Sequence, residues 1–317
     1  MRRREFIVGL AALGNVGRAR AQDHIRRVGA LITEPDNVLE VVLKQNGWVV
    51  GQNLRVEYRI TRGDTDLSRQ YARELIALQP DVVFAQTNTS MAALQAEHST
   101  IPTVFAMVSD PIGMHYVENF ARPGGNVTGF TPFEPSLGGK WVSLIKEAVP
   151  NVEHLGIVYN PEPGNNSQAF RQSIDEVANR MGISSIETPS GDGSDIDRLI
   201  RALGNKPNSG LIFLPDGVTS VRRVELAALV AQCRLPAIYP LRYFCKSGGL
   251  MSYGVDVSKI VAGAASYVER ILRGAKPAEL PVQAPTEFEF VVNQTAARQL
   301  GLQLSPAILA RADEVIE

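Results

Sequence analysis

The chain has 317 residues, more than one ordinary domain needs, and 44% of them are hydrophobic while 21% are charged. This composition excludes a disordered or fibrous chain. The 32 basic residues are balanced by 33 acidic ones, so no positive surplus exists to neutralise a phosphate backbone and nucleic acid is not an expected partner.

The first 21 residues have the features of an export signal. Residues 2–4 are arginines, residues 6–16 form a short apolar stretch, and residues 19–21 have the small-x-small form that a signal peptidase cuts. Arg3 and Arg4 also resemble a twin-arginine signal, so the Sec and twin-arginine routes both stay open. The alternative is an ordinary basic N-terminus on a cytosolic protein. We expect cleavage after Ala21 and a mature protein in the periplasm, since no later apolar run is long enough to span a bilayer.

After this signal, short apolar β-branched runs alternate with amphipathic stretches. We expect strands over 26–32, 53–60, 81–85 and 102–106, and helices over 37–46, 66–78 and 90–97. Alternation of strands with helices implies a parallel sheet that has helices on both faces. The stretch 109–133 is rich in Gly and Pro, which indicates turns and a chain crossing and not another regular unit.

The alternation of strands and helices then begins again. We expect strands over 154–159, 183–187, 210–214, 236–239 and 249–253, and helices over 140–149, 167–181, 195–203 and 220–233. Two successive units of similar size predict an α/β fold with two Rossmann-like lobes, each built on a parallel sheet.

The C-terminal part predicts how the lobes are joined. A long helix over 257–273 is followed by a break, an alternating strand over 287–293 and two short helices. These elements cannot form a third domain, so we expect the helix to pack on lobe one and the strand to join lobe two. Lobe one would comprise 22–130 plus 254–280, and lobe two 131–253 plus 281–317. Several crossings between lobes make a hinge, and a hinge lets a cleft close on a ligand.

Ligands of open α/β sheets bind at the carboxyl ends of the strands, and this rule selects the candidate residues of lobe one. Thr87, Asn88, Thr89 and Ser90 open a helix, where hydroxyl and backbone N–H groups favour an anion such as a carboxylate; helix capping is the alternative. Asp110 follows the strand at 102–106, where its carboxylate would pair with an ammonium group or cap the turn at Pro111.

Four candidates belong to lobe two or to the hinge. Asn160 and Asp216 occupy the matching strand ends of lobe two, where a turn-forming role is the alternative. Tyr239 and Tyr253 end short strands near the expected hinge, and each offers a ligand an apolar wall with a hydroxyl group; core packing is the alternative.

The sequence shows no pattern for binding a metal or a cofactor, and it leaves the state of its two cysteines open. Cys233 and Cys245 are the only cysteines, and both a disulfide between them and two free thiols stay open. The four histidines are scattered without metal-ligand spacing, so we expect no metal and no cofactor.

An enzymatic function is not favoured, and we expect no catalytic residues. The segment after the first strand, 31–35, contains no glycine, although a nucleotide-binding enzyme needs a Gly-rich loop there. The glycines at 124–125 lack the Lys-Ser/Thr ending of a phosphate-binding loop, and the chain contains no Gly-x-Ser-x-Gly motif. A periplasmic ligand sensor is the alternative to transport.

Several motifs along the chain together resemble a known family. They are RRREFI and ARAQ near the start, SDPIG (109–113), FARPGGNVTG (120–129), LPAIYP (235–240), GGLMSYG (248–254) and the closing LGLQLSPAILARADEVIE (300–317). The chain resembles ABC-transporter substrate-binding proteins of the type I periplasmic binding fold, in the group similar to aromatic-amino-acid binders. The resemblance implies a monomer that encloses a small solute, an amino acid or related compound, at the hinge and delivers it to an ABC permease in the inner membrane.

One segment departs from the family pattern. Residues 31–48 are about two helical turns shorter than the corresponding stretch usually is. The loop after the first strand normally lines the cleft. Its shortening is expected to widen the site or weaken binding. The ligand contacts that the family makes from this loop are therefore not assigned to Thr33, Glu34 and Asp36.

Overall fold

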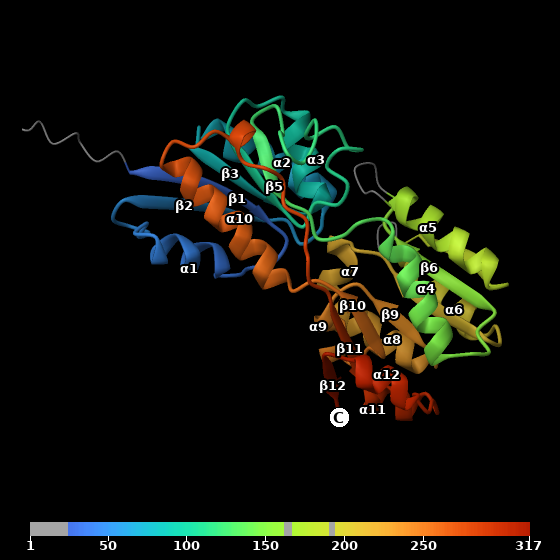
Figure 1. Ribbon diagram of the computed structural model, residues 1–317. Coiled ribbons are helices and arrows are strands. Elements are labelled where there is room, and N and C mark those ends of the chain that lie inside the picture. Colours follow the sequence, from blue (N-terminus) through green and yellow to red (C-terminus); the bar gives the residue numbers. More distant parts are fainter. Residues whose placement is uncertain (1–24, 162–166, 190–193) are drawn as a thin grey trace, which may run out of the picture.

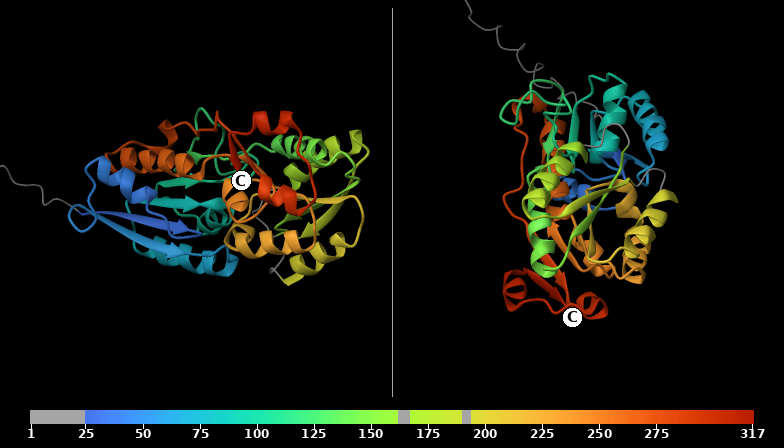
Figure 2. Two further views of the ribbon diagram at one scale, coloured as in Figure 1. Left: turned by 90° about the horizontal axis from the view of Figure 1, so that it is seen from below. Right: turned by 90° about the vertical axis from the view of Figure 1, so that its right-hand side faces the viewer.

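The computed structural model describes residues 25–161, 167–189 and 194–317. The expected signal peptide at 1–21 lies outside the described residues. Two α/β lobes lie side by side, each with its own central sheet (Figures 1 and 2). We call the five-stranded sheet with its helices lobe one, and the seven-stranded sheet with its helices lobe two.

Lobe one is a parallel sheet with strand order β2-β1-β3-β4-β5. Its strands are β1 (Arg26–Ile32), β2 (Leu54–Ile60), β3 (Val82–Gln86), β4 (Thr103–Ala106) and β5 (Val127–Phe130). Its helices are α1 (Val38–Gln45), α2 (Thr65–Ala77), α3 (Thr87–Ala96) and α10 (Val257–Leu272). Right-handed crossovers place α1 on one face of the sheet and α2 and α3 on the other.

The long helix α10 returns from the distant C-terminal part of the chain to lobe one. It packs beside α1 and against β3, β4 and β5, as Figure 1 shows. Its buried residues recur at helical spacing, from Ile260 and Val261 to Ile271 and Leu272, so the amphipathic pattern is satisfied by burial against this sheet. The opposite face of the sheet, under α2 and α3, has a separate core that includes Leu75.

Lobe two has strand order β12-β11-β10-β9-β8-β6-β7. Its strands are β6 (His154–Tyr159), β7 (Ser184–Pro189), β8 (Ser209–Phe213), β9 (Ala237–Tyr239), β10 (Met251–Gly254), β11 (Glu289–Asn293) and β12 (Glu314–Ile316). Its helices are α4 (Leu137–Ala148), α5 (Ser167–Arg180), α6 (Ser194–Gly204), α7 (Gly217–Val221), α8 (Arg223–Gln232), α9 (Arg242–Lys246), α11 (Gln294–Gln299) and α12 (Pro306–Arg311). The strand expected over 287–293 is β11, which pairs antiparallel with β10 in an otherwise parallel sheet.

Some elements differ from the sequence-based expectations. β5 lies inside the stretch that was expected to hold only turns, because a four-residue strand that contains a glycine shows no alternation of apolar and polar residues. The helix expected over 220–233 is divided into α7 and α8, since Asp216 caps a helix that already begins at Gly217. The short elements α9 and β12 were not expected, and α3 begins at Thr87 instead of Ser90.

Three segments of the described chain cross between the lobes, at 131–136, at 255–256 and after Gln283 (Figure 1). Phe130 forms a β-bridge with Gln283, and Thr131 N–H donates to the Gln283 carbonyl at 2.9 Å, so two crossings lie side by side. The lobe boundaries stay a proposal. Gly254 belongs to β10 of lobe two and Gln283 pairs with lobe one, which moves the expected ends by one and three residues.

The question of a disulfide is resolved, because Cys233 and Cys245 are free thiols. Burial raises the pKa of Cys245 to about 12, so this thiol is protonated and unreactive at neutral pH. Across 25–161, 167–189 and 194–317, no three His, Cys, Asp or Glu side chains gather as they would around a metal ion. In the same ranges, no helix combines the length and the apolar composition that a membrane crossing requires.

Candidate functional site

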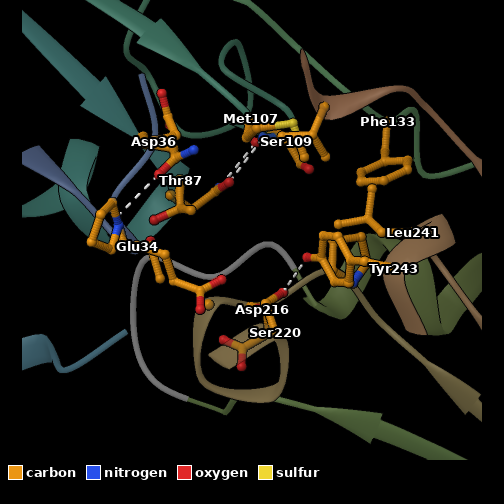
Figure 3. A pocket seen from close by; sticks show the side chains of 17 residues that line it. Glu34, Asp36, Thr87, Met107, Ser109, Phe133, Asp216, Ser220, Leu241 and Tyr243 are labelled. Atoms are coloured by element: carbon orange, nitrogen blue, oxygen red, sulfur yellow. Dashed lines mark hydrogen bonds between the residues drawn. The ribbon is translucent and has the colours of Figure 1, made fainter. Parts of the chain in front are cut away.

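A cavity of about 210 Å³ lies between the lobes, at the carboxyl ends of the strands (Figure 3). Its volume is below the ~300–1,000 Å³ of pockets for drug-sized ligands, so it suits a compact solute. The described residues that line it from lobe one are Thr33, Glu34, Pro35, Asp36, Gln86, Thr87, Asn88, Met107 and Ser109. Lobe two contributes Pro215, Asp216, Gly217, Ser220, Leu241 and Tyr243; the first crossing contributes Phe133, and the start of α10 contributes Val257.

The lobe-one wall is shaped by unusual backbone conformations. Thr87, directly after β3, has φ 80°, and Met107, directly after β4, has φ 59°. A positive φ is rare for any L-residue and particularly for a β-branched one, and such residues concentrate at functional sites. The two strand ends are joined by Asn88, whose amide donates to the Ser109 carbonyl at 3.0 Å and accepts from Ser109 N–H at 2.8 Å.

The lobe-two wall is shaped by side-chain hydrogen bonds. The Asp216 carboxylate accepts from Thr219 N–H at 2.9 Å, which caps α7, and from the Asn160 amide at 3.0 Å. The Tyr243 hydroxyl donates to Ser220 Oγ at 2.8 Å, and the Ser220 hydroxyl in turn donates to the backbone carbonyl of Asp216 at 2.6 Å. Asp216, Ser220 and Tyr243 therefore form one connected group facing the cavity, as Figure 3 shows.

The charged side chains of the cavity wall are all acidic. Its charged side chains are Glu34, Asp36 and Asp216, and none of the described residues that line it is Lys, Arg or His. Glu34 is paired with Arg223 Nη1 at 2.8 Å. Burial raises the pKa of Asp216, against hydrogen bonds from Thr219, Asn160, Val218 and Gly217 that lower it. Burial likewise raises the pKa of Asp36, against backbone hydrogen bonds at the start of α1.

The N-terminal end of α3 lies at the cavity wall. Its N-cap residue, Gln86, makes no side-chain capping hydrogen bond, because its Oε1 instead accepts from Thr33 N–H at 3.1 Å. The first backbone N–H groups of this helix and the positive end of its dipole therefore face the cavity, where Thr87 and Asn88 line it. This end of the cavity favours a carboxylate or another anionic group.

The lobes touch each other beside the cavity. Gly63 follows β2 in lobe one with φ 79°, and a Cβ atom there would lie 2.7 Å from the Val218 nitrogen of lobe two. The ion pair between Glu34 and Arg223 joins the same two lobes. Backbone contact across the cleft leaves no room for a side chain, so this is a closed arrangement of the lobes.

Four of the nine candidate residues come together at the cavity. Thr87, Asn88 and Asp216 line it. Asn160 lies behind Asp216, to which it donates a hydrogen bond, and it lines a smaller cavity of about 20 Å³ next to the first. Asn88 and Ser109 line both cavities, so the two spaces adjoin.

The other five candidates lie elsewhere. Thr89 and Ser90 belong to α3 but do not line the cavity, because the helix starts earlier and turns their side chains away from it. The Asp110 carboxylate accepts from Gly113 N–H at 2.9 Å, which is the turn-capping alternative. Tyr239 is fully buried and stacks between Phe213 and Phe244, both at 4.7 Å between ring centroids.

Tyr253 also lies outside the cavity and has a structural role. Its ring stacks on Phe288 at 5.8 Å, and its carbonyl accepts from Trp141 Nε1 at 2.8 Å. Both tyrosines were selected because they end strands near the hinge. β9 and β10 direct these side chains into packing contacts instead of the cleft.

The strand-end rule missed several lining residues. Thr33, Glu34 and Asp36 line the cavity although their segment is shortened. Tyr243 lies four residues beyond Tyr239, in the unexpected helix α9. Phe133 lies in the first crossing, and Met107 and Ser109 directly follow β4. A stricter use of the rule, applied to every residue within three positions of a strand end, would have found Thr33, Met107 and Ser109.

Comparison with known proteins gives consistent matches along the chain. The profile of a family described as "ABC transporter substrate binding protein" matches residues 35–316. A curated tyrosine-binding protein from Clostridioides difficile (strain R20291) is 23% identical over 262 residues, which are 82% of this chain and 74% of that protein.

Solved structures match the whole architecture. A conserved domain protein from Vibrio cholerae O1 biovar eltor has a TM-score of 0.83 at 29% identity, and an ABC domain in complex with L-Trp from Streptococcus pneumonia has 0.81 at 23%. A ligand-free, open substrate-binding protein with adhesive properties from Clostridium difficile has 0.63 at 20%. Each match covers 92% of this chain and 99% of the other.

Proposed function

Because the chain belongs to the family of ABC transporter substrate-binding proteins, we propose that it captures a small solute, an amino acid or related compound, in the interlobe cavity and delivers it to an ABC permease. The protein has the type I periplasmic binding fold. We propose that it acts outside the cytoplasm as a monomer, without a cofactor and without chemical turnover of the solute.

One observation carries this proposal: the cavity lies where strand ends of both lobes meet, and crossings of the chain connect those lobes. Residues of lobe one, such as Thr87, and of lobe two, such as Asp216, line the same space. A solute that contacts both walls gains most of its interactions only when the lobes are closed. Its binding energy therefore shifts the lobes towards the closed arrangement.

Contacts between the lobes beside the cavity indicate that the lobes separate when the solute enters and leaves. Gly63 lies against the backbone of Gly217 and Val218, and Glu34 is paired with Arg223, so the lobes touch on this side of the cavity. A permease would obtain the solute by separating the lobes.

Fluorescence of Trp141 tests the binding step. The chain has two tryptophans, Trp48 and Trp141, and the ring of Trp141 lies 6.2 Å from that of Phe133, which lines the cavity. In a Trp48→Phe variant, the remaining tryptophan reports on the first crossing. We expect saturable fluorescence changes on titration with a cognate solute, and X-ray scattering should show a smaller radius of gyration with it.

Two controls complete the test. The Trp48→Phe variant must unfold at a temperature close to that of the original protein. Product analysis by NMR after long incubation should recover the solute unchanged. An identical scattering profile with amino acids, amides and sugars alike, or conversion of the solute into product, would contradict the proposed function.

The export step is tested separately. Expression of the full chain in a bacterial host should give a protein in the periplasmic fraction whose mass corresponds to a chain starting at Gln22. A chain that keeps residues 1–21 and stays in the cytoplasm would contradict the proposed location but not the proposed solute binding.

A further inference from the structure

The three carboxylates of the cavity wall differ in whether a cationic side chain of the protein pairs with them. Glu34 has Arg223, with both carboxylate oxygens within 3.0 Å of Nη1. Asp36 accepts from Val38 N–H at 3.0 Å, and Asp216 accepts from Thr219 N–H and the Asn160 amide. Those donors are neutral. No Lys or Arg of the described residues forms an ion pair with Asp36 or Asp216.

These two aspartates line the cavity from opposite lobes. Asp36 precedes α1 in lobe one, and Asp216 precedes α7 in lobe two (Figure 3). Both pKa values are raised by burial, so closing the empty cleft keeps two like charges in a poorly solvated space. A cationic group between them removes this cost, and it does so only in the closed arrangement.

An ordinary zwitterionic amino acid would not balance these charges. Its carboxylate fits the N-terminus of α3, and its ammonium group fits one of the two aspartates. The two charges of a zwitterion cancel, so the site as a whole stays as negative as in the empty cleft, which is unfavourable for buried carboxylates. A solute with a second positive charge, or one that lacks the carboxylate, brings net positive charge to the two aspartates.

Three further observations fit an organic solute with a cationic group. Thr33 lines the cavity and is only 6% exposed, and its Oγ1 has no hydrogen-bond partner among the described residues, so it is available to a polar solute group. Within the part of the chain that the structure describes, no set of three carboxylates lies close enough to hold a metal ion. The apolar side chains of Phe133, Met107 and Leu241 suit a hydrocarbon stem.

We propose that this site selects solutes that carry more positive than negative charge, such as basic amino acids, amines or guanidines, with cationic nitrogen held between Asp36 and Asp216. This inference rests on the proposed function and specifies the solute class of that same cavity. It predicts discrimination by charge at matched size and shape.

Calorimetric titration with matched pairs of solutes tests it. Arginine and citrulline have nearly the same shape but differ by the guanidinium charge, and lysine and norleucine differ by the terminal ammonium group. We expect each cationic solute to bind at least ~10-fold more tightly than its neutral partner, since a tenfold change corresponds to about 1.4 kcal/mol. Agmatine, which is arginine without its carboxylate, shows whether the α3 end contributes: tighter binding of arginine means that it does.

Asp36→Asn is the decisive variant. Asparagine keeps an oxygen that accepts from Val38 N–H but removes the charge, so the preference for arginine over citrulline should fall towards one while citrulline binding changes little. The matched control is Asp110→Asn, which removes a carboxylate of the same lobe that accepts from Gly113 N–H and does not line the cavity. It should leave the preference unchanged.

The results separate the two proposals. Equal binding of arginine and citrulline, or tighter binding of tyrosine than of every cationic solute, would overturn the charge inference and leave solute capture intact. A preference that survives Asp36→Asn would also overturn it. If no solute of the panel binds or closes the lobes, the proposed function is wrong and the inference fails with it.

Discussion

The two walls of the cleft keep their shapes by different means. The lobe-one wall depends on left-handed backbone at Thr87 and Met107, whereas the lobe-two wall depends on the hydrogen bonds that the Asp216 carboxylate accepts and the Tyr243 hydroxyl donates. A wall set by backbone conformation tolerates many different side chains, but it is sensitive to substitutions that alter the allowed φ and ψ angles. A side-chain network is sensitive to the loss of a single polar atom. Substitutions in the network of Asp216 and Tyr243 should therefore act through charge and hydrogen bonds, and those of glycines in lobe one through conformation and contact.

Loss of the Asp216 charge should have the largest effect on this comparison. Asp216→Asn keeps an acceptor for Thr219 N–H and removes the negative charge at the cavity. We expect solute affinity to fall ~30-fold or more, since removing one partner of a buried charged contact costs 2–5 kcal/mol. Calorimetry measures this loss.

The same variant should also make the ligand-free protein more stable at neutral pH. Burial raises the pKa of Asp216 above its unfolded value, so its contribution to stability is present at low pH and is lost as the pH rises through the folded pKa. The stability gain of Asp216→Asn should therefore shrink as the pH is lowered. A variant that binds normally, or that is less stable than the original at neutral pH, would show that the charge has no such role.

A substitution that blocks the contact of lobe one with lobe two should have the next largest effect on solute binding. Gly63→Ala places a Cβ atom 2.7 Å from the Val218 nitrogen, against backbone that cannot move aside easily. We expect ~10-fold weaker solute binding and a scattering profile that stays open with the solute present.

Gly51→Ala is the matched control for this substitution. Gly51 has φ 83°, close to the 79° of Gly63, but a Cβ there would meet nothing within 4 Å. Both variants should lose ~1 kcal/mol of stability from the positive φ, and only Gly63→Ala should impair binding. Equal impairment in both would mean that the contact between lobes is not needed.

The hydroxyl groups of Tyr243 and Tyr239 give a smaller contrast. Tyr243→Phe removes the hydroxyl that donates to Ser220, and we expect about a fivefold loss of affinity, equivalent to the ~1 kcal/mol of one hydrogen bond. The hydroxyl of Tyr239 is buried without a partner, so Tyr239→Phe should keep binding intact and keep or raise stability. The opposite ranking would restore Tyr239 as a binding residue.

The ion pair between lobes should have the smallest effect. The Glu34 side chain is 42% exposed, and partly exposed pairs contribute ~0–1 kcal/mol, so Glu34→Gln should weaken solute binding by no more than about fivefold. The salt dependence of affinity should become shallower in the variant. Asp66→Asn, which removes an exposed pair inside α2, is the control and should change neither quantity.

Some residues of the cavity wall could be selected from the sequence and others could not. Asp216, Asn160 and Asn88 were selected because polar residues at strand ends are visible in the sequence, and the structure places Asp216 and Asn88 in the cavity wall with Asn160 bonded to Asp216. Tyr243 was missed because nothing in the sequence marks the five-residue helix α9. Tyr239 was selected in its place, although the direction of a strand residue depends on which sheet face meets the core. The backbone conformations of Thr87 and Met107 leave no signature in residue type either.

The sequence by itself determined that two parallel-sheet units follow each other, because the alternation of β-branched runs with amphipathic stretches is a local property of the chain. It also determined that a helix over 257–273 and a strand near 290 must return to those units, since neither can bury its apolar side alone. Only the tertiary structure decided which side chains meet across the cleft. That arrangement depends on contacts between residues as distant as Gly63 and Gly217, and on left-handed backbone at strand ends, and neither is encoded in any local pattern.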